Sequence, residues 1–554
     1  MSFAQRTRHV ARTLICAALL SAVACAKPHD PSRDRTLAIA LASEPTLLAP
    51  PLIAETQGFV VADQILERLA EPDSTLDVLG DRAYRPRLAE GWSWAPDSLS
   101  IAFRIAADAR WHDGRPVTAR DVRFTFALYT DTALASPAAP LLANIDSVQA
   151  RDERVAVFWF HDRRARQFFD ATYHMRILPE HVLRDVSPAS LRSSAFARAP
   201  TGSGPFRFAR WVPGQLVELA ANAEFRRGRA RVDRVVFTIA PDPSVALARA
   251  LSGNVDVDPD LRSSDVPVVA RSSAISVVRW ASLSSGLVML DLRDPARPNH
   301  AHPVFGDRSV RRALTMAIDR RRITAAALGD GAEAARGPLP WALMRGAPAT
   351  LLPFDTAAAA ALLDSSGWRA DHAGGVRHRG STPFRFTLLV PSTGLAAQRV
   401  AVLMQDELRR HGAQMQIEIA DDAALAARLT EHQFDAALIA LDWDPNPLSA
   451  RQVWGSNNGS DETSNFSRYR SDTFDAAMDA AASATDSMSA GLATSQAWQT
   501  LIRDAPAIWL YDLRRVGAVR GCVHPAGVRP DAWWASLSDW SVSSSCRDGS
   551  ERPS

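Results

Sequence analysis

The chain has 554 residues, of which 47% are apolar and 22% charged, so at about 100–200 residues per domain it should form two or three domains or lobes. Lys and Arg total 63, but Lys27 is the one lysine, which excludes a Walker phosphate loop, a Schiff-base lysine beyond that position and a Ser-x-x-Lys nucleophile. The net charge is +2, and residues 1–24 carry three arginines and no acid, so the remainder is near neutral and offers no basic face for nucleic acid.

An export signal opens the chain. Arg6, Arg8 and Arg12 precede an apolar run over 14–24, which is the anatomy of a secretory signal peptide and which we assign to residues 1–24. The run is about half of the ~20 residues that a membrane-spanning helix needs, and no later stretch of the sequence reaches that length. We therefore expect an exported chain with a soluble body.

Cys25 directly follows this run, and two interpretations of it remain open. Ala22-Val23-Ala24 is an acceptable small-x-small site for ordinary cleavage, which would release a freely soluble protein. The same residues followed by Cys25 are similar to a lipobox, in which the cysteine takes a lipid and anchors the protein to a membrane. We favour the lipid anchor, with the polar, proline-containing residues 25–35 as its tether.

A strand and a helix are predicted in the first third of the chain. Apolar residues alternate with small or polar ones over 99–105, which indicates a half-buried strand. Thr118 and Asp121 form an acidic variant of the capping box and so predict the start of a helix. The buried side of that helix should carry three apolar residues: Val122, Phe124 and Leu128.

Two segments that could be mistaken for ligand sites are predicted to be loops. Gly202-Ser203-Gly204 is glycine-rich but runs into a strand-like sequence, which indicates a turn rather than a phosphate-binding loop. His300 and His302 could offer two imidazoles to a metal, but they lie in a proline-flanked segment with no third ligand nearby. We expect a solvated loop there and no metal site.

From about residue 303 the pattern alternates between helix and strand. The spacing of apolar residues over 310–318, with arginines on the opposite face, predicts a helix. Strand, helix and strand then follow in a row, which implies an α/β arrangement with a largely parallel or mixed sheet between helices. The segments are a strand over 384–390, a helix over 400–408 stopped by Gly412, a strand over 415–419, a strand over 434–441 buried on both faces, and alanine-rich surface helices at 356–361 and 481–495.

The segment Asp442-Trp443-Asp444 is the strongest candidate binding site. It follows a buried strand directly, at the carboxyl end where α/β sheets place ligands. Carboxylates beside an aromatic ring suit a cationic ammonium group. In an extended segment Asp442 and Asp444 share one face, about 6–7 Å apart, and Trp443 points to the other. That spacing would also fit a glycosidase pair, although nothing else supports one, and an exposed Asp-Pro turn is the structural alternative.

The remaining cysteines are Cys522 and Cys546, since Cys16 lies in the signal peptide and Cys25 would be lipidated. In an oxidising compartment we expect the two to form a disulfide that staples the C-terminal tail, with two unpaired thiols as the alternative. Zinc is disfavoured because it needs four clustered ligands and only His524 lies near.

The sequence contains none of the usual catalytic motifs. Gly-x-Ser-x-Gly, His-Glu-x-x-His and Gly-x-Gly-x-x-Gly are absent. We therefore expect neither an enzyme nor a bound cofactor, and an exported hydrolase is disfavoured.

Five separated motifs together resemble a known family. They are LAEGW at 88–92, WHDGRPVTARDV at 111–122, ILPEH at 177–181, TGSGPF at 201–206 and VRRALTMAIDR at 310–320. In this order they are similar to the signatures of the family 5 extracellular solute-binding proteins, the oligopeptide- and dipeptide-binding components of ABC importers. The resemblance covers residues 36 to 540.

The resemblance implies a two-lobed, periplasmic-binding-protein-like α/β fold with mixed sheets, an extra domain and a hinge. The implied limits are a discontinuous lobe I at 36–71, 203–284 and 505–546, an extra domain II at 72–202 and a lobe III at 285–504. In peptide-binding members an aspartate after the strand that ends near Leu441 holds the peptide's α-amino group, so the resemblance implies that role for Asp442 or Asp444.

The resemblance also implies a function. The expected protein is a monomeric, lipid-anchored binding protein in the periplasm or cell envelope, which delivers a peptide-like solute to an ABC permease with its ATPase. The same scaffold carries non-peptide solutes, so a metal chelate, haem, an oligosaccharide or an opine is the first alternative. A sensor or scaffold without transport is the second.

Overall fold

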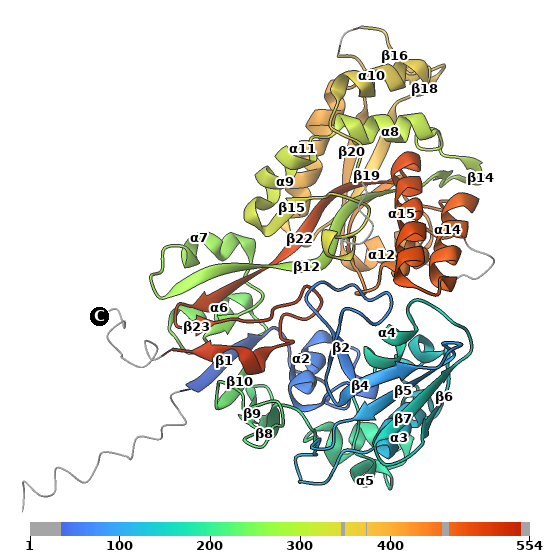
Figure 1. The fold of residues 1–554 in the computed structure, drawn as a ribbon. Helices are drawn as coiled ribbons and strands as arrows, with labels where there is room; N and C mark the ends of the chain where they lie inside the picture. The colour runs from blue at the N-terminus through green and yellow to red at the C-terminus, as the bar shows by residue number, and fades with distance from the viewer. Residues whose placement is uncertain (1–34, 345–349, 373, 457–464, 544–554) are drawn as a thin grey trace, which may run out of the picture.

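Two long antiparallel strands join two lobes (Figure 1). The computed structural model describes residues 35–344, 350–372, 374–456 and 465–543. Strands β12 (Ile275–Leu290) and β22 (Ala507–Arg520) run from one lobe into the other. We call the part drawn below them, with β1–β11 and the C-terminal tail over 521–543, the lower lobe, and the part above, with β13–β21, the upper lobe. The expected two-lobed α/β fold is confirmed, whereas the domain limits stay a prediction.

One mixed sheet extends through both lobes, in the order β20-β19-β21-β12-β22-β11-β1-β10-β9-β8, with β15 pairing with β22. In the lower lobe β1 pairs in parallel with β10 and β11, and β8, β9 and β10 form an antiparallel meander. The elements of this part are β1 (Thr36–Leu41), α2 (Thr56–Ile65), β8 (Phe206–Val212), β9 (Leu216–Ala221), β10 (Arg234–Ile239), α6 (Pro243–Leu251), β11 (Val257–Asp258), α7 (Val266–Val269), β23 (Val523–His524) and β24 (Ser541–Val542).

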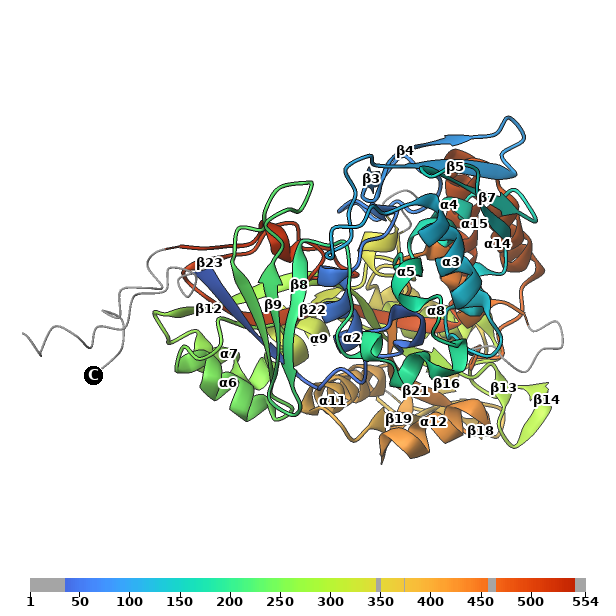
Figure 2. The ribbon, with the colours of Figure 1, turned by 90° about the horizontal axis from the view of Figure 1, so that it is seen from below.

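A separate four-stranded antiparallel sheet, β4-β5-β7-β6, forms the far side of the lower lobe (Figure 2). The strand predicted over 99–105 is β5, and its inward residues are fully buried. The elements are β2 (Ala70–Pro72), β3 (Tyr84–Pro86), β4 (Ala89–Trp94), β5 (Ser100–Ile105), α3 (Ala119–Thr130), β6 (Ile145–Ala150), β7 (Val155–Phe160), α4 (Gln167–Thr172) and α5 (Glu180–Leu183).

Helix α3 begins as predicted. The Thr118 backbone N–H donates to Asp121 Oδ2 at 2.7 Å, which completes the capping box. Val122 and Leu128 are buried, but Phe124 is only half-buried, so the prediction is wrong for Phe124, whereas Thr125 and Tyr129 are buried as well.

The glycine-rich segment is the predicted turn into β8, and the reason for the glycines is steric. A Cβ at Gly202 would lie 1.9 Å from the carbonyl oxygen of Ile65, and one at Gly204 would lie 2.7 Å from that of Gln64. The segment therefore passes directly over the C-terminal end of α2, where only glycine fits.

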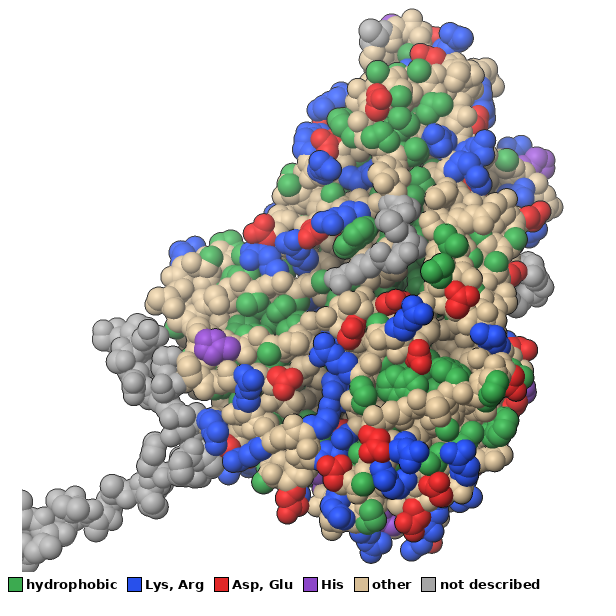
Figure 3. Space-filling model, in the orientation of Figure 1, with side chains coloured by type: hydrophobic (Ala, Val, Ile, Leu, Met, Phe, Trp, Pro, Cys, Tyr) green, Lys and Arg blue, Asp and Glu red, His purple; other side chains and the backbone are tan. Residues whose placement is uncertain are grey.

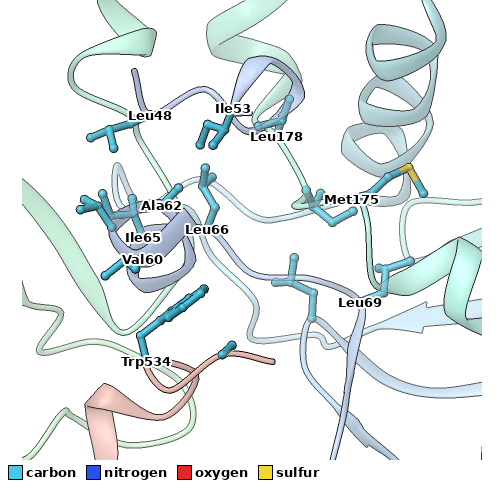
Figure 4. Close-up of a cluster of buried hydrophobic side chains, with 14 of the residues drawn as sticks. Leu48, Ile53, Val60, Ala62, Ile65, Leu66, Leu69, Met175, Leu178 and Trp534 are labelled. Atoms are coloured by element: carbon cyan, nitrogen blue, oxygen red, sulfur yellow. The ribbon is translucent and has the colours of Figure 1, made fainter. Parts of the chain in front are cut away.

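The core of the lower lobe forms around α2. Figure 4 shows Val60, Ile65 and Leu66 of this helix packed between Leu178 and the C-terminal Trp534. The C-terminal tail therefore packs on helix α2 and completes this core. Gln64 Nε2 also donates a hydrogen bond to the Trp534 carbonyl, across 470 positions of the sequence.

Buried ion pairs cross the same core. Asp63 accepts from Arg176 Nε at 2.7 Å and from Trp534 Nε1 at 2.9 Å, and Arg68 lies 3.6 Å away. Burial raises the pKa of Asp63, but Arg176 and Arg68 outweigh it and hold that pKa well below its usual range. The carboxylate is therefore charged and compensated inside the lobe.

A second group of these ions reaches the C-terminal tail. Glu71 lies 2.9 Å from Arg87 and 3.7 Å from Arg529. Arg529 also pairs with Asp531 at 3.0 Å, and Tyr173 donates to Asp531 at 3.0 Å. Burial raises the pKa of Glu71, but Arg87, Arg529 and Arg68 bring it down from 4.5 to about 2.

The upper lobe places the β20-β19-β21-β12-β22 part of the sheet between two layers of helices. Its elements are β13 (Arg293–Asp294), β14 (Arg297–Ala301), α8 (Arg308–Ala317), α9 (Arg320–Leu328), β15 (Ala332–Ala334), α10 (Thr356–Ser365), β16 (Arg369–Ala370), β17 (Arg377–Arg379), β18 (Thr382–Pro383), β19 (Arg385–Pro391), α11 (Leu395–Arg410), β20 (Gln414–Ala420), α12 (Asp422–Thr430), β21 (Ala436–Asp442), α13 (Ala450–Trp454), α14 (Asp472–Ser483) and α15 (Ser487–Asp504). Short 3-10 helices occur in both lobes. They span Pro50–Leu52, Ala139–Leu142, Pro188–Ser193, Ala195–Ala197, Ser263–Asp265, Gly329–Gly331, Trp341–Leu343, Pro447–Ser449 and Leu537–Asp539.

The strand predicted to be buried on both faces is β21. Ala437 and Ile439 belong to the hydrophobic cluster that includes α14 and α15, while Ala436 and Leu438 belong to the cluster with α8 and α11. Because β19 pairs in parallel with both β20 and β21, and β21 pairs antiparallel with β12, the predicted mixed sheet is confirmed.

The helices of this lobe follow the predicted segments with one difference, at residues 481–495. Gly412 ends α11 with φ 76°, as expected of a left-handed residue after a helix. The alanine-rich 481–495 is not one helix, because it spans the turn from α14 to α15, where Asp486 caps the second helix. Strand β20 lies at the sheet edge, so Ile419 is 55% exposed.

The expectation that the arginines of α8 all face outward is wrong for Arg311, which is 6% exposed. Its guanidinium donates to the carbonyl oxygens of Phe305 at 2.8 Å, Asp504 at 2.6 Å and Ala505 at 3.1 Å. Arg311 therefore caps the C-terminal end of α15, where unpaired carbonyls favour a cation. Burial lowers the pKa of Arg311 to about 10, so the group stays charged at neutral pH.

Candidate functional site

The candidate site lies where the two connecting strands pass between the lobes. Strand β12 changes register against β22 between Ala281 and Ser285, and again between Gly286 and Leu287. Such irregularities bend a strand and re-aim its side chains. Ser282 Oγ holds the bend by donating to the carbonyl oxygen of Leu513 at 2.7 Å. The predicted residues 442–444 lie directly beside this bend, because Asp442 pairs with Ser284 of β12.

Asp442 and Asp444 are both exposed at the end of β21. The Ser284 hydroxyl donates to Asp442 Oδ1. Neither carboxylate has an ion pair with any arginine or histidine in the described part of the chain. Exposed Asp442, buried Trp443 and exposed Asp444 alternate as predicted for an extended segment.

Trp443 points the other way, into the upper lobe. It is 6% exposed and packs in the cluster with Leu283 and Trp454. Its Nε1 donates to Ser285 Oγ at 2.9 Å, and its backbone N–H donates to the Leu283 carbonyl at 2.9 Å. In this arrangement the indole fixes the position of the two flanking aspartates, and its ring face is not open to a solute.

Asp512, which is not among the residues predicted for the site, lies opposite Ser285 on β22. Asp512 Oδ2 accepts from the Trp341 backbone N–H at 3.3 Å, while Oδ1 is buried and has no hydrogen-bond partner in the structure. Burial raises the pKa of Asp512 from 3.8 to about 7, with Glu333 adding to the shift. The sequence could have pointed to Asp512, because it is the one acidic residue in the otherwise apolar segment 507–513.

The neighbours of Asp512 do not neutralise it. Glu333, which pairs with Asp512 across β15 and β22, is held by Arg514 and by Arg336 at 3.1 Å. Both arginines form their ion pairs with Glu333 and not with Asp512. The Asp512 carboxyl is therefore buried, with one oxygen that has no hydrogen-bond partner in the structure. Paired residues of adjacent strands share a face, so Asp512 lies on the same side of the sheet as Ser285. Trp443 lies on that side too, because its Nε1 donates to Ser285 Oγ.

The lobes touch at the start of α15. Gly80, Asp81 and Arg163 of the lower lobe line a cavity of about 190 Å³ together with Asp486 and Ser487 at the start of α15. Figure 3 shows hydrophobic side chains gathered on the lower lobe just below its boundary with the upper lobe. Leu76 and Leu79 of the lower lobe belong to the same hydrophobic cluster as Trp443, so the two lobes share apolar contacts as well.

His302 has a structural role. Its Nδ1 accepts from the backbone N–H groups of Val304 and Phe305, at 3.1 and 3.0 Å, so Nε2 carries the proton and donates to Asp435 at 3.1 Å. His300 is exposed on β14. Over the described ranges, no three His, Cys, Asp or Glu side chains gather in a way that could hold a metal ion.

The predicted modification sites are only partly within the described residues. Cys25 and the signal peptide lie outside them, as does Cys546. Cys522 is buried and disulfide-bonded, but the pairing of Cys522 with Cys546 stays a prediction. Within the described part of the chain, no helix has the length and apolar character that crossing a bilayer requires.

Exposed, uncompensated carboxylates on a rigid support are suited to bind a cation. The support is rigid here because Trp443 and Asn446 fix the backbone on either side, the latter by accepting from Leu448 N at 3.0 Å through its side chain. An ammonium group is a fitting partner, since charge-assisted hydrogen bonds are about twice as strong as neutral ones.

A family model and individual related sequences both match this chain. The model of the bacterial extracellular solute-binding proteins, family 5 middle region, matches residues 83–463. The oligopeptide-binding protein AppA of Bacillus subtilis is 24% identical over 485 residues, which cover 87% of this chain and 87% of that protein. A putative ABC transporter peptide-binding protein of Brucella ovis is 29% identical over 443 residues, covering 78% of this chain and 79% of its own.

Solved structures share the fold. AppA in complex with a nonapeptide superposes with a TM-score of 0.68 at 22% identity, covering 92% of this chain and 99% of AppA. NikZ of Campylobacter jejuni in complex with Ni(L-His) gives a TM-score of 0.71 at 22% identity, with coverage of 92% and 99%.

Proposed function

The chain belongs to the family 5 bacterial extracellular solute-binding proteins, and on that premise we propose that it captures a peptide-like solute between its lobes and delivers it to the permease of an ABC importer. The family is one of exported solute-binding proteins rather than of enzymes. The relatives named above are described as oligopeptide- or peptide-binding proteins, which supports a peptide as the solute.

The observation that carries the peptide assignment is the pair of open carboxylates, Asp442 and Asp444, beside the bend of β12. A peptide at neutral pH presents one ammonium group at its N-terminus. We assign that group to these two aspartates, with Trp443 as the positioning residue that holds them. Asp512 lies near the same bend but on the side of the sheet that Trp443 occupies, so we assign it no contact with this ammonium group.

Closure of the lobes is the proposed mechanism of capture. Strands β12 and β22 are the long connections that both lobes share, and both change register near Ser285. A solute that contacts both lobes stabilises the closed form by its differential affinity for that form. Hinge closure of this kind lets a permease distinguish loaded from empty protein.

The N-terminal segment and the partners complete the proposal. Residues 1–24 direct export, Cys25 carries a lipid and 25–35 form the tether, so that a monomeric body is held near the permease and its ATPase. Mass spectrometry of the mature N-terminus tests the anchor: an acylated Cys25 supports it, whereas an unmodified Cys25 or cleavage at another residue contradicts it.

Calorimetric titration with peptides tests the proposed solute. The unliganded mature protein should bind members of a library of di- to hexapeptides at neutral pH. N-acetylated versions of the same peptides should bind much more weakly, because acetylation removes the ammonium charge. A library that gives no saturable binding, or acetylated peptides that bind equally well, would contradict the proposal.

A further inference from the structure

A polar pocket of about 260 Å³ lies at the outer end of the upper lobe, away from the hinge. It is lined by Arg293 and Asn299 of the β13–β14 hairpin, by His432, and by Arg468, Tyr469 and Arg470. The hairpin projects at the periphery of the lobe in both Figure 1 and Figure 2.

This end of the sheet is opposite the solute site. Strands β12 and β21 are antiparallel, with Ser284 facing Asp442 at one end and Leu290 facing Ala436 at the other. The pocket follows the second end. Seven residues of β21 separate the two sites, or about 20 Å at roughly 3.3 Å per residue.

The wall of the pocket is built from a tightly bonded loop. Asn465 is buried and its side chain donates to the carbonyl oxygens of Gly455 and Tyr469, both at 2.8 Å, while accepting from Ser467 Oγ at 2.9 Å. The backbone of Arg468 adopts φ 51°, a left-handed conformation that residues other than glycine rarely take. The loop therefore fixes the position of Arg468 and, through the Tyr469 N–H, the backbone that leads to Arg470.

The charges of the pocket do not cancel. Arg468 is neutralised by the buried Asp291, to which its Nε donates at 2.9 Å. Arg293 and Arg470 form no ion pair and no side-chain hydrogen bond with any residue that the structure describes. His432 donates from Nδ1 to the Phe466 carbonyl at 3.2 Å, which leaves Nε2 open. Two guanidinium groups thus line one cavity without a counter-charge.

We propose that this pocket is a second ligand site, which binds a small oxyanion of the phosphate or sulfate type. The planar guanidinium fork matches such an anion with two parallel N–H donors. The volume accommodates the anion with part of its hydration shell, since a water occupies about 30 Å³ in the liquid. Asn299 supplies a further amide from the hairpin side.

Titration of the mature protein with inorganic phosphate tests the proposal. Phosphate or sulfate should bind saturably and raise the thermal midpoint, whereas chloride at matched ionic strength should do neither, because screening alone is not site binding. Titration with glycerol 3-phosphate distinguishes free phosphate from a phosphate monoester as the ligand. Binding of either supports the site, and tighter binding of glycerol 3-phosphate identifies a monoester as the ligand.

The decisive variant is the double substitution Arg293→Gln and Arg470→Gln. It should weaken phosphate binding about tenfold or more, since each arginine provides charge-assisted hydrogen bonds. Arg297→Gln is the matched control, because Arg297 lies on the same hairpin but is paired with Asp294 at 2.9 Å and does not line the pocket. An unchanged thermal midpoint without phosphate shows that the variants fold.

Two results would overturn the site: the absence of saturable phosphate or sulfate binding at millimolar concentration, or equal binding by the double variant and the unaltered protein. The outcome is independent of the proposed peptide function. The Asp442 and Asp444 variants should keep phosphate binding, and the Arg293 and Arg470 double variant should keep peptide binding.

Discussion

In the lower lobe Asp63 lies 2.7 Å from Arg176 and 3.6 Å from Arg68, whereas in the upper lobe Asp442 and Asp444 are exposed without an ion pair to a described residue. Asp63 and Glu71 of the lower lobe are buried, and each has arginine counter-ions. In the upper lobe, Asp442 and Asp444 beside the bend, and Arg293 and Arg470 in the outer pocket, have no counter-ion among the described residues. The difference separates charges that hold the fold together from charges that are free to bind a solute.

The contrast also explains how the tail is fixed. Arg529 of the tail pairs with Glu71 across most of the sequence and also with its neighbour Asp531, so the C-terminal tail is joined to the lower lobe by an ion pair as well as by Trp534. Burying such ions costs several kcal/mol per ion, which is recovered only when every partner is present. Loss of one partner should therefore be far more harmful here than at the hinge.

The largest expected effect is on folding. Asp63→Asn keeps the shape of the side chain but leaves Arg176 and Arg68 without their counter-charge, and should lower the free energy of unfolding by about 3–5 kcal/mol. Denaturant titration measures the loss. Asp444→Asn is the matched control, and as an exposed substitution it should change stability by no more than about 0.5 kcal/mol. Equal effects of the two substitutions would abolish the distinction between the regions.

The acid sensitivity of the lower lobe should come partly from Glu71. Its pKa falls from 4.5 to about 2 on folding, so its contribution to stability is present above pH 4.5 and is lost as the pH falls through 2. Glu71→Gln should reduce the stability at pH 7 and flatten its decline between pH 4.5 and 2. A thermal melting series over this range measures both, and an unaltered pH profile would contradict the paired state of Glu71.

Asp512 should show the opposite pH dependence. Its pKa rises from 3.8 to about 7 on folding, so the stability it contributes is present below pH 3.8 and is lost as the pH rises through 7. Asp512→Asn should therefore stabilise the protein at pH 8 by at least about 1.4 kcal/mol relative to pH 4, the equivalent of one pKa unit. If the substitution destabilises the protein equally at both pH values, Asp512 has a charge partner that the structure lacks.

The sequence was informative where the signal is local. The capping box of Thr118 and Asp121, the end of α11 at Gly412 and the doubly buried β21 all depend on neighbouring residues, and all three are confirmed. Alternation along an extended segment also placed Asp442 and Asp444 on the side opposite Trp443.

What could not be predicted depends on residues far apart in the chain. Asp63 and Arg176 are 113 positions apart, so no local pattern shows that they pair. Arg311 was expected to face outward because helical spacing alone does not reveal that the end of α15 needs a cap. Strand β12 could not be predicted because Ser284, Ser285 and Gly286 follow one another at its bend, which interrupts the alternation of a strand.

The most direct test of the account is a double-mutant cycle between the solute and the hinge carboxylates. One arm replaces Asp442 and Asp444 with Asn, and the other replaces a bound peptide with its N-acetylated form, with calorimetric affinities for all four combinations. We expect each change alone to weaken binding about tenfold or more and the two together to cost little more than either, because both remove the same charge pair. Additive losses, or unchanged binding by the Asn variant, would show that the open carboxylates of the upper lobe do not hold the solute's amine.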